Sequence, residues 1–401
     1  MNPASGERLW PLAVAIFVLM LPVTAVVPAL EELTGGRHPE LSDFDKHLFM
    51  VANMLAALIF APLAGRLSDR SGRRKPIILG AMLANALVLV LLAQDAPYAV
   101  HLALRFADGA LHITALTLLM TLAMDRSVHS GTGRAMGTAG AAVTLGVATG
   151  APVGGLVAET GAVNVLFAGA GLSLLLAAWV AGLTDRVGAP ERTQRPTWSE
   201  LPLRRLAAPY VFTFADRLSV GFIISTVTLY LRTVLEAQPA QIGMLMGAFM
   251  LPFALLTYPF GRLARRVSPL WLMMAGSAAY GGILIALALA PLPLWWLLMP
   301  LGGISAAAMF APSLVLTAQA AGTDQRGTAM GGFHAAGSLG FLLGPLVGGG
   351  ILALASVLDR PGWFTAFVAV AVLQWLCVAL FLPAACRHPK PSAQAEVGRH
   401  P

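Results

Sequence analysis

The chain has 401 residues, of which 57% are hydrophobic and only 11% are charged. Soluble domains carry roughly 25% charged residues, so this composition excludes an ordinary water-exposed surface. The formal net charge is +7, and the chain contains only two cysteines.

Twelve long apolar stretches follow one another along the chain. Each is about 20 residues long or longer, which is enough for a helix to cross the hydrocarbon of a bilayer. Because a lipid-exposed backbone must satisfy its own hydrogen bonds, these stretches predict helices and an all-α membrane protein. The first follows a single arginine without a clear small-residue cleavage site, so we interpret it as a span and not as a signal peptide. Their approximate bounds are 9–31, 47–65, 76–94, 98–124, 135–157, 163–184, 207–231, 239–261, 269–291, 294–320, 328–355 and 362–383.

Two connections are longer than the others. Residues 34–46 predict an outer loop, and residues 185–206, with three prolines and five arginines, predict a linker between six spans and six spans. The resulting domains are an N-terminal six-helix bundle over 1–184, the cytoplasmic linker 185–206, a C-terminal six-helix bundle over 207–386 and a polar cytoplasmic tail over 387–401.

The basic residues are distributed unequally between the two sides of the membrane. Twenty fall on the side that carries both termini and the linker; the other side has Arg37, Lys46, Arg232 and Arg360. Basic residues favour cytoplasmic loops, so we expect both termini to be cytoplasmic. The positive net charge then reflects topology, and we expect no nucleic acid partner.

A loop rich in glycine and arginine joins the second and third spans. It reads Gly65-Arg66-Leu67-Ser68-Asp69-Arg70-Ser71-Gly72-Arg73-Arg74-Lys75. Asp69 is the one negative charge in this positive run. A shorter form of the block returns at residues 261–266.

The fourth span carries ionisable residues on one face, because His101, Arg105, Asp108 and His112 follow at steps of four, three and four. Ionisable groups inside a membrane are costly unless they are paired or face a cavity. Arg105 and Asp108 therefore form either a structural pair or part of a cavity-lining proton or substrate site.

The seventh span contains Asp216 and Arg217. About ten residues at 1.5 Å each place Asp216 roughly 15 Å deep, near the midplane. Adjacent side chains on a helix point about 100° apart, so we expect that these two do not satisfy each other. Asp216 is then either a proton carrier or a member of a structural ion pair with another group.

One glycine pattern occurs twice at a constant offset of 194 residues. The two copies are Gly137, Gly146, Gly150, Gly154 and Gly155, and Gly331, Gly340, Gly344, Gly348 and Gly349. Self-similarity at half the chain length indicates two related halves. In a chain this hydrophobic, that is typical of a transporter built from repeats.

These motifs together resemble the major facilitator superfamily. The 65–75 loop is similar to the family's signature loop, and Arg105-Phe106-Ala107-Asp108-Gly109 is similar to its span-four motif. The glycines of span eleven, with Pro345, match the antiporter motif that the family's drug/proton exchangers carry in span five. In span five itself the glycines fit but the proline is displaced by one; the motif residues there are Gly146, Gly150, Pro152, Gly154 and Gly155.

The resemblance implies two six-helix bundles, each made of inverted three-helix repeats, with spans one, four, seven and ten lining a central cavity. It implies that Asp69 meets the start of span eleven near Thr328 in the outward-open state. The implied gating motif is Gly65, Asp69, Arg70, Gly72, Arg73 and Asp125. Arg74 and Lys75 are expected only to set topology. The implied cavity residues for proton coupling or substrate are Arg105, Asp108, His112, Asp216 and Arg217.

We therefore expect a secondary active transporter in the bacterial inner membrane that exports small amphipathic or drug-like compounds in exchange for protons, by alternating access. Its partners would be a small-molecule substrate and membrane lipid, and it would be a monomer without cofactor or metal. No phosphate-binding glycine loop, metal-spaced Cys/His cluster or convincing nucleophile indicates an enzyme. The alternatives are transport of a lipid, sugar or metabolite, including uptake, and a transporter-like sensor.

Overall fold

The computed structural model describes residues 9–71, 74–125, 132–183, 202–321, 326–358 and 361–387. Within these residues, twelve helices are long and apolar enough to cross a membrane. Each of them begins and ends within four residues of its predicted bounds. The prediction of an all-α protein with twelve spans is therefore confirmed.

The twelve spans divide into two sets of six. The first set is α1 (Trp10–Ala25) with its extensions η1 (Val27–Ala29) and α2 (Leu30–Leu33), then α3 (Asp43–Ser71), α4 (Lys75–Leu92), α5 (Tyr98–Asp125), α6 (Thr132–Glu159) and α7 (Ala162–Ala181). The second set is α8 (Leu203–Phe222) with the π-helical segment η3 (Ile223–Val227) and α9 (Thr228–Thr233), then α10 (Pro239–Leu263), α11 (Pro269–Leu289), α12 (Leu292–Ala320), α13 (Arg326–Val357) and α14 (Gly362–Arg387). α8 begins inside the segment 185–206 that we predict as the linker.

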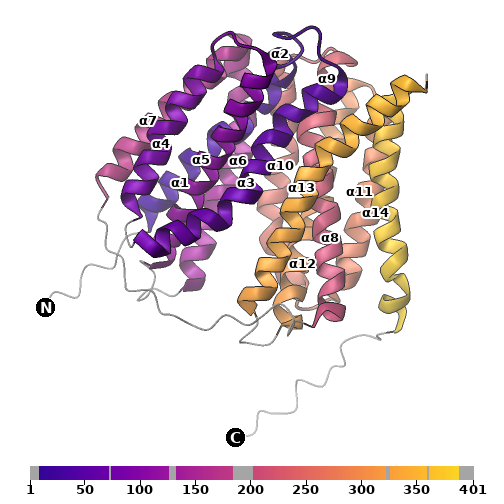
Figure 1. The fold of residues 1–401 in the computed structure, drawn as a ribbon. Helices are drawn as coiled ribbons and strands as arrows, with labels where there is room; N and C mark the ends of the chain where they lie inside the picture. The colour runs from indigo at the N-terminus through magenta and orange to yellow at the C-terminus, as the bar shows by residue number, and fades with distance from the viewer. Residues whose placement is uncertain are drawn as a thin grey trace, which may run out of the picture.

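Each set forms a bundle, and the two bundles lie side by side (Figure 1). Their most extensive mutual contacts are those of α6 with α10 and of α3 with α13, and shorter contacts join η1 with α10, α2 with α9 and α3 with η3. We call the end where α7 ends and α8 begins the linker end, and the end that carries residues 34–42 the loop end.

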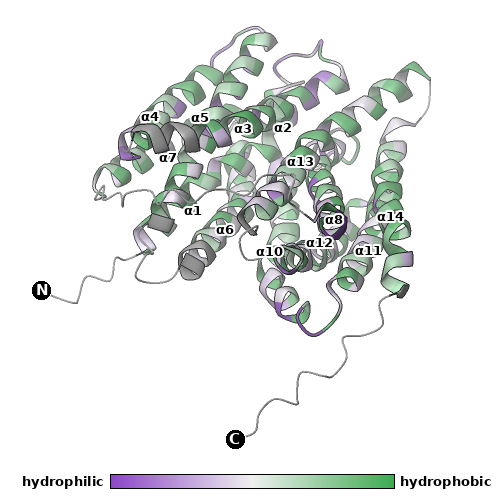
Figure 2. Ribbon diagram, turned by 60° about the horizontal axis from the view of Figure 1, so that its bottom comes forward, coloured by the Kyte–Doolittle hydropathy of each residue, from purple (hydrophilic) through white to green (hydrophobic). Residues whose placement is uncertain are grey.

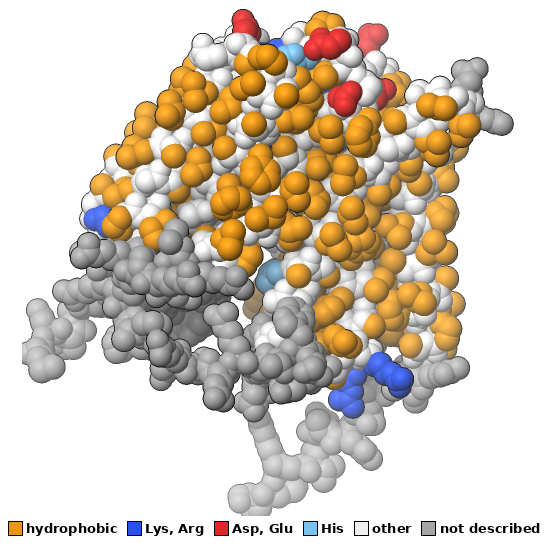
Figure 3. All heavy atoms as spheres, viewed as in Figure 1, with side chains coloured by type: hydrophobic (Ala, Val, Ile, Leu, Met, Phe, Trp, Pro, Cys, Tyr) orange, Lys and Arg blue, Asp and Glu red, His pale blue; other side chains and the backbone are white. Residues whose placement is uncertain are grey.

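The surface of the bundles is apolar along the middle of the helices (Figure 3). Large side chains such as Leu87, Leu175 and Leu255 are more than half exposed. Acidic side chains gather at the loop end and basic ones at the linker end in the same view. Figure 2 shows the same apolar helices from nearer the linker end. Such a surface suits hydrocarbon along its middle and water at its ends.

The second span begins earlier than its approximate predicted start, because α3 begins at Asp43 and not near residue 47. Ser42 and Asp45 form a reciprocal cap: the Asp45 backbone N–H donates to Ser42 Oγ at 3.2 Å, and the Ser42 N–H donates to Asp45 Oδ2 at 3.3 Å. These bonds satisfy backbone donors that a helix start leaves free. The predicted 34–46 loop is therefore shorter by four residues.

The repeated glycines allow helix backbones to approach closely within each bundle. A Cβ at Gly150 or Gly154 of α6 would meet the carbonyl oxygens of Leu21 and Ala25 of α1. In the second bundle, Gly340 and Gly344 of α13 meet α8 in the same way. Small residues allow this contact in lipid, where close packing replaces the hydrophobic drive.

The last glycine of each copy faces the opposite bundle. A Cβ at Gly155 would meet the Pro239 carbonyl oxygen of α10, and one at Gly349 would lie 2.9 Å from the His47 ring of α3. Each Gly-Gly pair thus presents one residue to its own bundle and the next to the partner bundle. Adjacent residues can do this because they point about 100° apart around a helix.

Candidate functional site

A cavity of about 720 Å³ lies between the two bundles. Its walls come from α1, α3 and α5 of the first bundle and from α8, α12 and α13 of the second. Lining residues such as Ala61, Pro62 and Gly331 belong to the linker-end halves of their helices. A recess between the bundles is visible toward the linker end in Figure 3, with a histidine side chain in it. A cavity of this size suits a small organic molecule.

The loop end of the cavity is closed by contacts between the bundles. Glu32 of α2 forms an ion pair with Arg232 of α9. His47 Nε2 of α3 lies 2.9 Å from Thr226 Oγ1 of η3. The contact of Gly155 with Pro239 lies at the same end. The bundles are therefore joined at the loop end and enclose a cavity toward the linker end.

Arg217 is the cationic group of the cavity wall among the described residues. Its side chain is 23% exposed, and its guanidinium carbon lies 4.3 Å from the ring centroid of Phe310 and 5.5 Å from that of Phe253. Aromatic faces attract a guanidinium and hold it in place. The remaining polar lining consists of Asn53, His112, Thr213, His334 and Ser338, and the described lining includes no carboxylate.

Asp216 lies behind this wall and is completely buried. Neither of its oxygens has a hydrogen-bond partner in the described part of the chain, although Arg217 Nε lies 3.4 Å from Oδ2. Asp216 and Arg217 are therefore in ion-pair contact, but no hydrogen bond from Arg217 satisfies the carboxylate, as expected for adjacent residues on a helix. The aliphatic part of the Arg217 side chain is long enough to place Nε near the carboxylate while the rest of the guanidinium lines the cavity.

A polar network crosses the second bundle on the same side as Asp216. Gln374 of α14 donates to the Ala215 carbonyl at 3.1 Å and to Ser219 Oγ at 2.8 Å. Ser277 of α11 donates to the Gln374 carbonyl at 2.9 Å. The Tyr280 hydroxyl is buried without a partner among the described residues, within electrostatic reach of Asp216. Three helices are thus joined by hydrogen bonds around an acid that takes no part in them.

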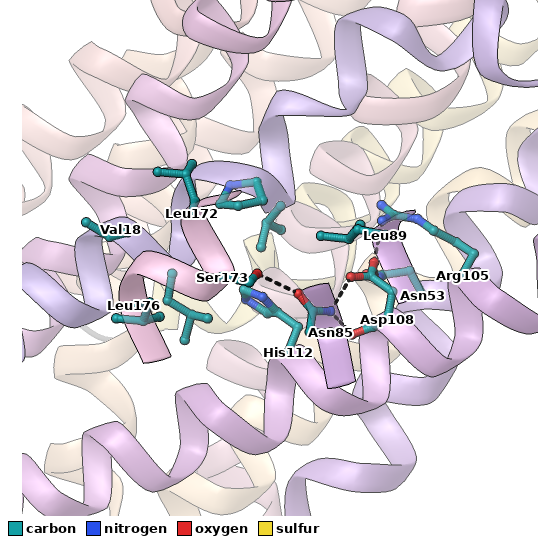
Figure 4. Close-up of a pocket in the computed structure, with 13 residues that line it drawn as sticks. Val18, Asn53, Asn85, Leu89, Arg105, Asp108, His112, Leu172, Ser173 and Leu176 are labelled. Atoms are coloured by element: carbon teal, nitrogen blue, oxygen red, sulfur yellow. Dashed lines mark hydrogen bonds and ion pairs between the residues drawn. The ribbon is translucent and has the colours of Figure 1, made fainter. Parts of the chain in front are cut away.

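Asp108 of α5 has the opposite surroundings (Figure 4). It forms an ion pair with Arg105, and it accepts hydrogen bonds from Asn53 at 2.9 Å and Asn85 at 2.7 Å. Ser173 of α7 donates to Asn85 Oδ1 at 2.9 Å. The Arg105 and Asp108 side chains are 3% and 9% exposed. Of the two interpretations of this pair, the geometry favours the structural one.

The two histidines of span four differ in position. His101 is buried, and its Nδ1 lies 2.9 Å from Nε2 of His38. His112 lines both the large cavity and a space of about 20 Å³ beside Asp108, room for a single water molecule. The predicted set is therefore split: His112 and Arg217 line the large cavity, and Arg105, Asp108 and Asp216 lie behind its walls.

The predicted gating motif falls on parts of the chain that cannot be compared with the structure. Gly72 and Arg73 lie outside the described residues, as do the side chains of Asp69, Arg70 and Asp125. Gly65 lies within α3, but its surroundings are likewise outside the described residues. The latch therefore stays a prediction.

Several residues of the site carry no signal in the sequence. Glu32, His47 and Thr226 are single polar residues with no motif around them. Arg232 offered one indication, because it is among the four basic residues on the side opposite to the linker. Contacts between distant helices depend on the packing of the two bundles, which a local pattern does not describe.

Two named relatives match part of the chain. The uncharacterized MFS-type transporter MJ1560 of Methanocaldococcus jannaschii is 29% identical over 162 residues, which cover 40% of this chain and 42% of that protein. The inner membrane transport protein RhmT of Escherichia coli is 28% identical over 169 residues, 42% of this chain and 38% of that protein. The matched segments thus span about two fifths of each relative.

Solved structures match nearly the whole chain. The nucleoside transporter NupG, crystallised as a point mutant, gives a TM-score of 0.78 at 16% identity, covering 94% of this chain and 99% of that one. A bacterial homologue of the human lysosomal transporter Spinster, in an inward-facing and occupied conformation, gives 0.80 at 15% identity, covering 97% and 98%. At these identities the likeness concerns the fold.

The family profile of the Major Facilitator Superfamily matches residues 12–213 and 209–401, which together cover nearly all of the sequence. The twelve spans, the two bundles and the cavity between them agree with this match. The chain is an integral, multi-pass membrane protein and belongs to the Major Facilitator Superfamily of secondary transporters.

Proposed function

We propose that this transporter couples the movement of a small amphipathic solute to protons by alternating access through the cavity. The solute would sit against the apolar and aromatic walls and reach Arg217. The contacts at the loop end would separate when the cavity opens there. The basic residues of the linker side support a cytoplasmic linker end, so the described conformation would open inward.

The observation that carries this proposal is the environment of Asp216. An ionised carboxylate that is buried without hydrogen bonds is costly, and its charged neighbour Arg217 is a cavity residue at 3.4 Å. Uptake of a proton removes that cost and weakens the hold of Asp216 on Arg217. A proton and a solute could therefore affect each other through Arg217. Asp108 is held by an ion pair and two amide hydrogen bonds and is the weaker candidate.

Two directions of transport remain as candidates. The glycine pattern shared with antiporters favours export in exchange for protons. The Asp216–Arg217 pair favours uptake, because protonation of Asp216 frees Arg217 for the solute, so that both would move together. We propose the bacterial inner membrane as the location and a monomer as the working unit.

Proteoliposomes with an imposed pH gradient test the proposal. The probes are three labelled solutes of low permeability: p-aminohippurate, an anion; ethidium, a cation; and uridine, a neutral polar solute. We expect gradient-dependent movement of at least one, and its direction assigns exchange or co-transport. Asp216→Asn should reduce gradient-driven accumulation to the level of empty liposomes.

Downhill exchange should survive in Asp216→Asn, because the neutral amide resembles the protonated acid. Accumulation by this variant equal to that of the unmodified protein would exclude Asp216 as the coupling group. A failure of all three probes to respond to the pH gradient would argue against proton coupling. Movement of uridine alone would favour the metabolite alternative over amphipathic solutes.

A further inference from the structure

The formal charge that the described cavity wall carries is positive and belongs to Arg217. Arg217 and two histidines, His112 and His334, line it, whereas the described lining residues include no Asp or Glu. The acid beside Arg217 is Asp216, which is 0% exposed and so cannot contact a solute in the cavity. The field of Arg217 also reaches His334. A cationic solute would meet this field without a carboxylate to pair with.

The guanidinium of Arg217 retains free donors. Arg217 makes no hydrogen bond within the described part of the chain, and its ion-pair contact with Asp216 uses Nε at 3.4 Å. Two aromatic rings hold the guanidinium in place. A positioned guanidinium binds a carboxylate through two parallel hydrogen bonds. Arg105 also lies within a span, but it forms an ion pair with Asp108 and its side chain is only 3% exposed, so it is not available to a solute.

The rest of the cavity wall suits an apolar body. Met20, Met54 and Leu58 face it from the first bundle, and Phe310 and Phe341 face it from the second. Thioether side chains adapt to irregular apolar shapes, and aromatic rings supply large apolar contact surfaces. The volume of about 720 Å³ admits a drug-sized molecule but not a large peptide.

We infer that the substrate is an amphipathic organic anion, a carboxylate attached to an apolar or aromatic body, and that Arg217 is the residue that selects it. This inference rests on the proposed use of the cavity for transport and adds the charge of the solute. Asp216 and the substrate carboxylate would compete for the same guanidinium. Removing the charge of Asp216 should therefore strengthen binding of the anion.

Binding of a matched probe series to the purified full-length protein tests the inference. The probes are 3-phenylpropionate, 3-phenylpropan-1-ol and 3-phenylpropylamine, which share one body and differ in the charge of the head group. We expect the acid to bind about tenfold or more tightly than the alcohol, as hydrogen bonds to charged groups allow. The amine should bind more weakly than the alcohol.

Four variants test whether Arg217 is responsible for the preference for the acid. Arg217→Gln should lower the affinity for the acid to that for the alcohol, and Arg217→Lys should give an intermediate value because it keeps the charge but loses the planar fork. Asp216→Asn should raise the affinity for the acid alone. Leu58→Ala should weaken all three probes alike.

Arg262→Gln, an exposed arginine of α10 at the linker end, is the control and should change nothing. Thermal unfolding of each variant checks its fold; if Arg217→Gln does not fold, Arg217→Lys and Asp216→Asn test the same contact. Equal affinity for the three probes, preference for the amine, or no binding of the acid would overturn the inference. So would an Asp216→Asn variant whose affinity for the acid is unchanged or lower.

The proposed function can fail separately. Movement of ethidium driven by the pH gradient, together with indifference to the acid probe, would leave proton-coupled transport in place and exclude the anion. Binding of the acid that depends on Arg217, without any response to a pH gradient, would support the anion site and exclude proton coupling.

Discussion

Asp108 and Asp216 both lie deep in the spans, and they differ in their partners. Asp108 is held by Arg105, Asn53 and Asn85, all within one bundle. Among the described residues, Asp216 has the contact with Arg217 of the cavity wall and no hydrogen bond. A buried charge with a full set of partners stabilises one arrangement, whereas a buried charge without them can change its state at small cost to the fold. This contrast separates a structural acid from a candidate coupling acid.

We expect Asp108→Asn to destabilise the protein by about 3–5 kcal/mol, because removal of one partner leaves the buried Arg105 guanidinium uncompensated. Asn85→Ala removes its hydrogen bond to the charged Asp108 together with the one it accepts from Ser173, and loss of the bond to the charged group alone should cost about 1.5–3 kcal/mol. Asp216→Asn removes a charge that lacks hydrogen bonds and should cost little. Thermal unfolding of the three variants in detergent measures the order.

The matched comparison lies in the two Asp→Asn variants, which make the same chemical change at two buried positions. A midpoint for Asp216→Asn as low as that for Asp108→Asn would show that both acids are structural. The assignment of Asp216 to coupling would then lose its support.

The repeated glycines affect helix packing at two levels. In α6, Gly150 and Gly154 bring the helix against α1, while Gly155 brings it against α10 of the other bundle. α13 repeats this arrangement with α8 and α3. The same pattern therefore builds the bundles and also sets how closely they meet at the loop end. Pro152 of α6 also contributes to the contact between the bundles, because it packs against Gly247 of α10.

We expect Gly155→Val to open the loop end, because the new Cβ would overlap the backbone carbonyl of Pro239, which cannot move aside as a side chain can. Overpacking of this kind costs about 1–3 kcal/mol, enough for about a 5–150-fold change in the ratio of closed to open molecules. Spin labels at Glu159 and Val234, exposed residues at the loop end, report the distance between the bundles after Cys377 and Cys386 are replaced by alanine.

Gly140→Val is the control on the same helix, since a Cβ at Gly140 has no atom within 4 Å in the part of the chain that the structure describes. It introduces the same β-branched residue into α6 and should leave the distance distribution unchanged. An unaltered distribution in Gly155→Val would contradict the packing role at the loop end. A change of equal size in both variants would trace it to helix propensity.

The whole molecule consists of two bundles that are joined at one end and enclose a cavity toward the other. The loop-end contacts differ in kind: close backbone packing at Gly155, a hydrogen bond between His47 and Thr226, and an ion pair between Glu32 and Arg232. Closely packed groups resist separation over short distances, whereas a partly exposed ion pair contributes little. We therefore expect packing to dominate the closure of this end.

Arg232→Gln should increase the open population at the loop end by no more than about fivefold, because the ion-pair side chains are 30% and 25% exposed and such pairs are worth about 0–1 kcal/mol. The same spin labels measure it. The charge-swapped double variant Glu32→Arg with Arg232→Glu should restore the closed distribution. If the swap fails to restore closure while Arg232→Gln opens the end, the arginine acts through another contact.

The orientation of the molecule in the membrane is a further prediction. Protease-cleavable tags at the two chain ends should be protected in intact cells and cut only after permeabilisation, because basic residues are retained on the cytoplasmic side. A tag inserted in the loop 34–42 should be cut without permeabilisation. Cleavage of a terminal tag in intact cells would reverse the topology and place the cavity opening on the outer side.

The spans could be predicted from the sequence because hydrocarbon imposes a local requirement: about 20 apolar residues in a row with internal hydrogen bonds. The two halves could be predicted because the glycine pattern returns at a constant offset. The polar residues of spans four and seven could be identified because any ionisable group there is costly. Each of these signals lies within one segment of the chain.

The roles of those residues depend on which helices pack together. Nothing local to Asp108 shows that Asn53 and Asn85 point at it, and nothing local to Asp216 shows that it lies near Tyr280 and outside the Gln374 network. The loop-end contact of Glu32 with Arg232 likewise joins residues 200 positions apart. The amino-acid sequence by itself determines the membrane helices and their number, because the bilayer requires of each helix only a run of apolar residues within one segment. Pairing, burial and access to the cavity required the packed bundles, because they arise from contacts between helices that are distant in the chain.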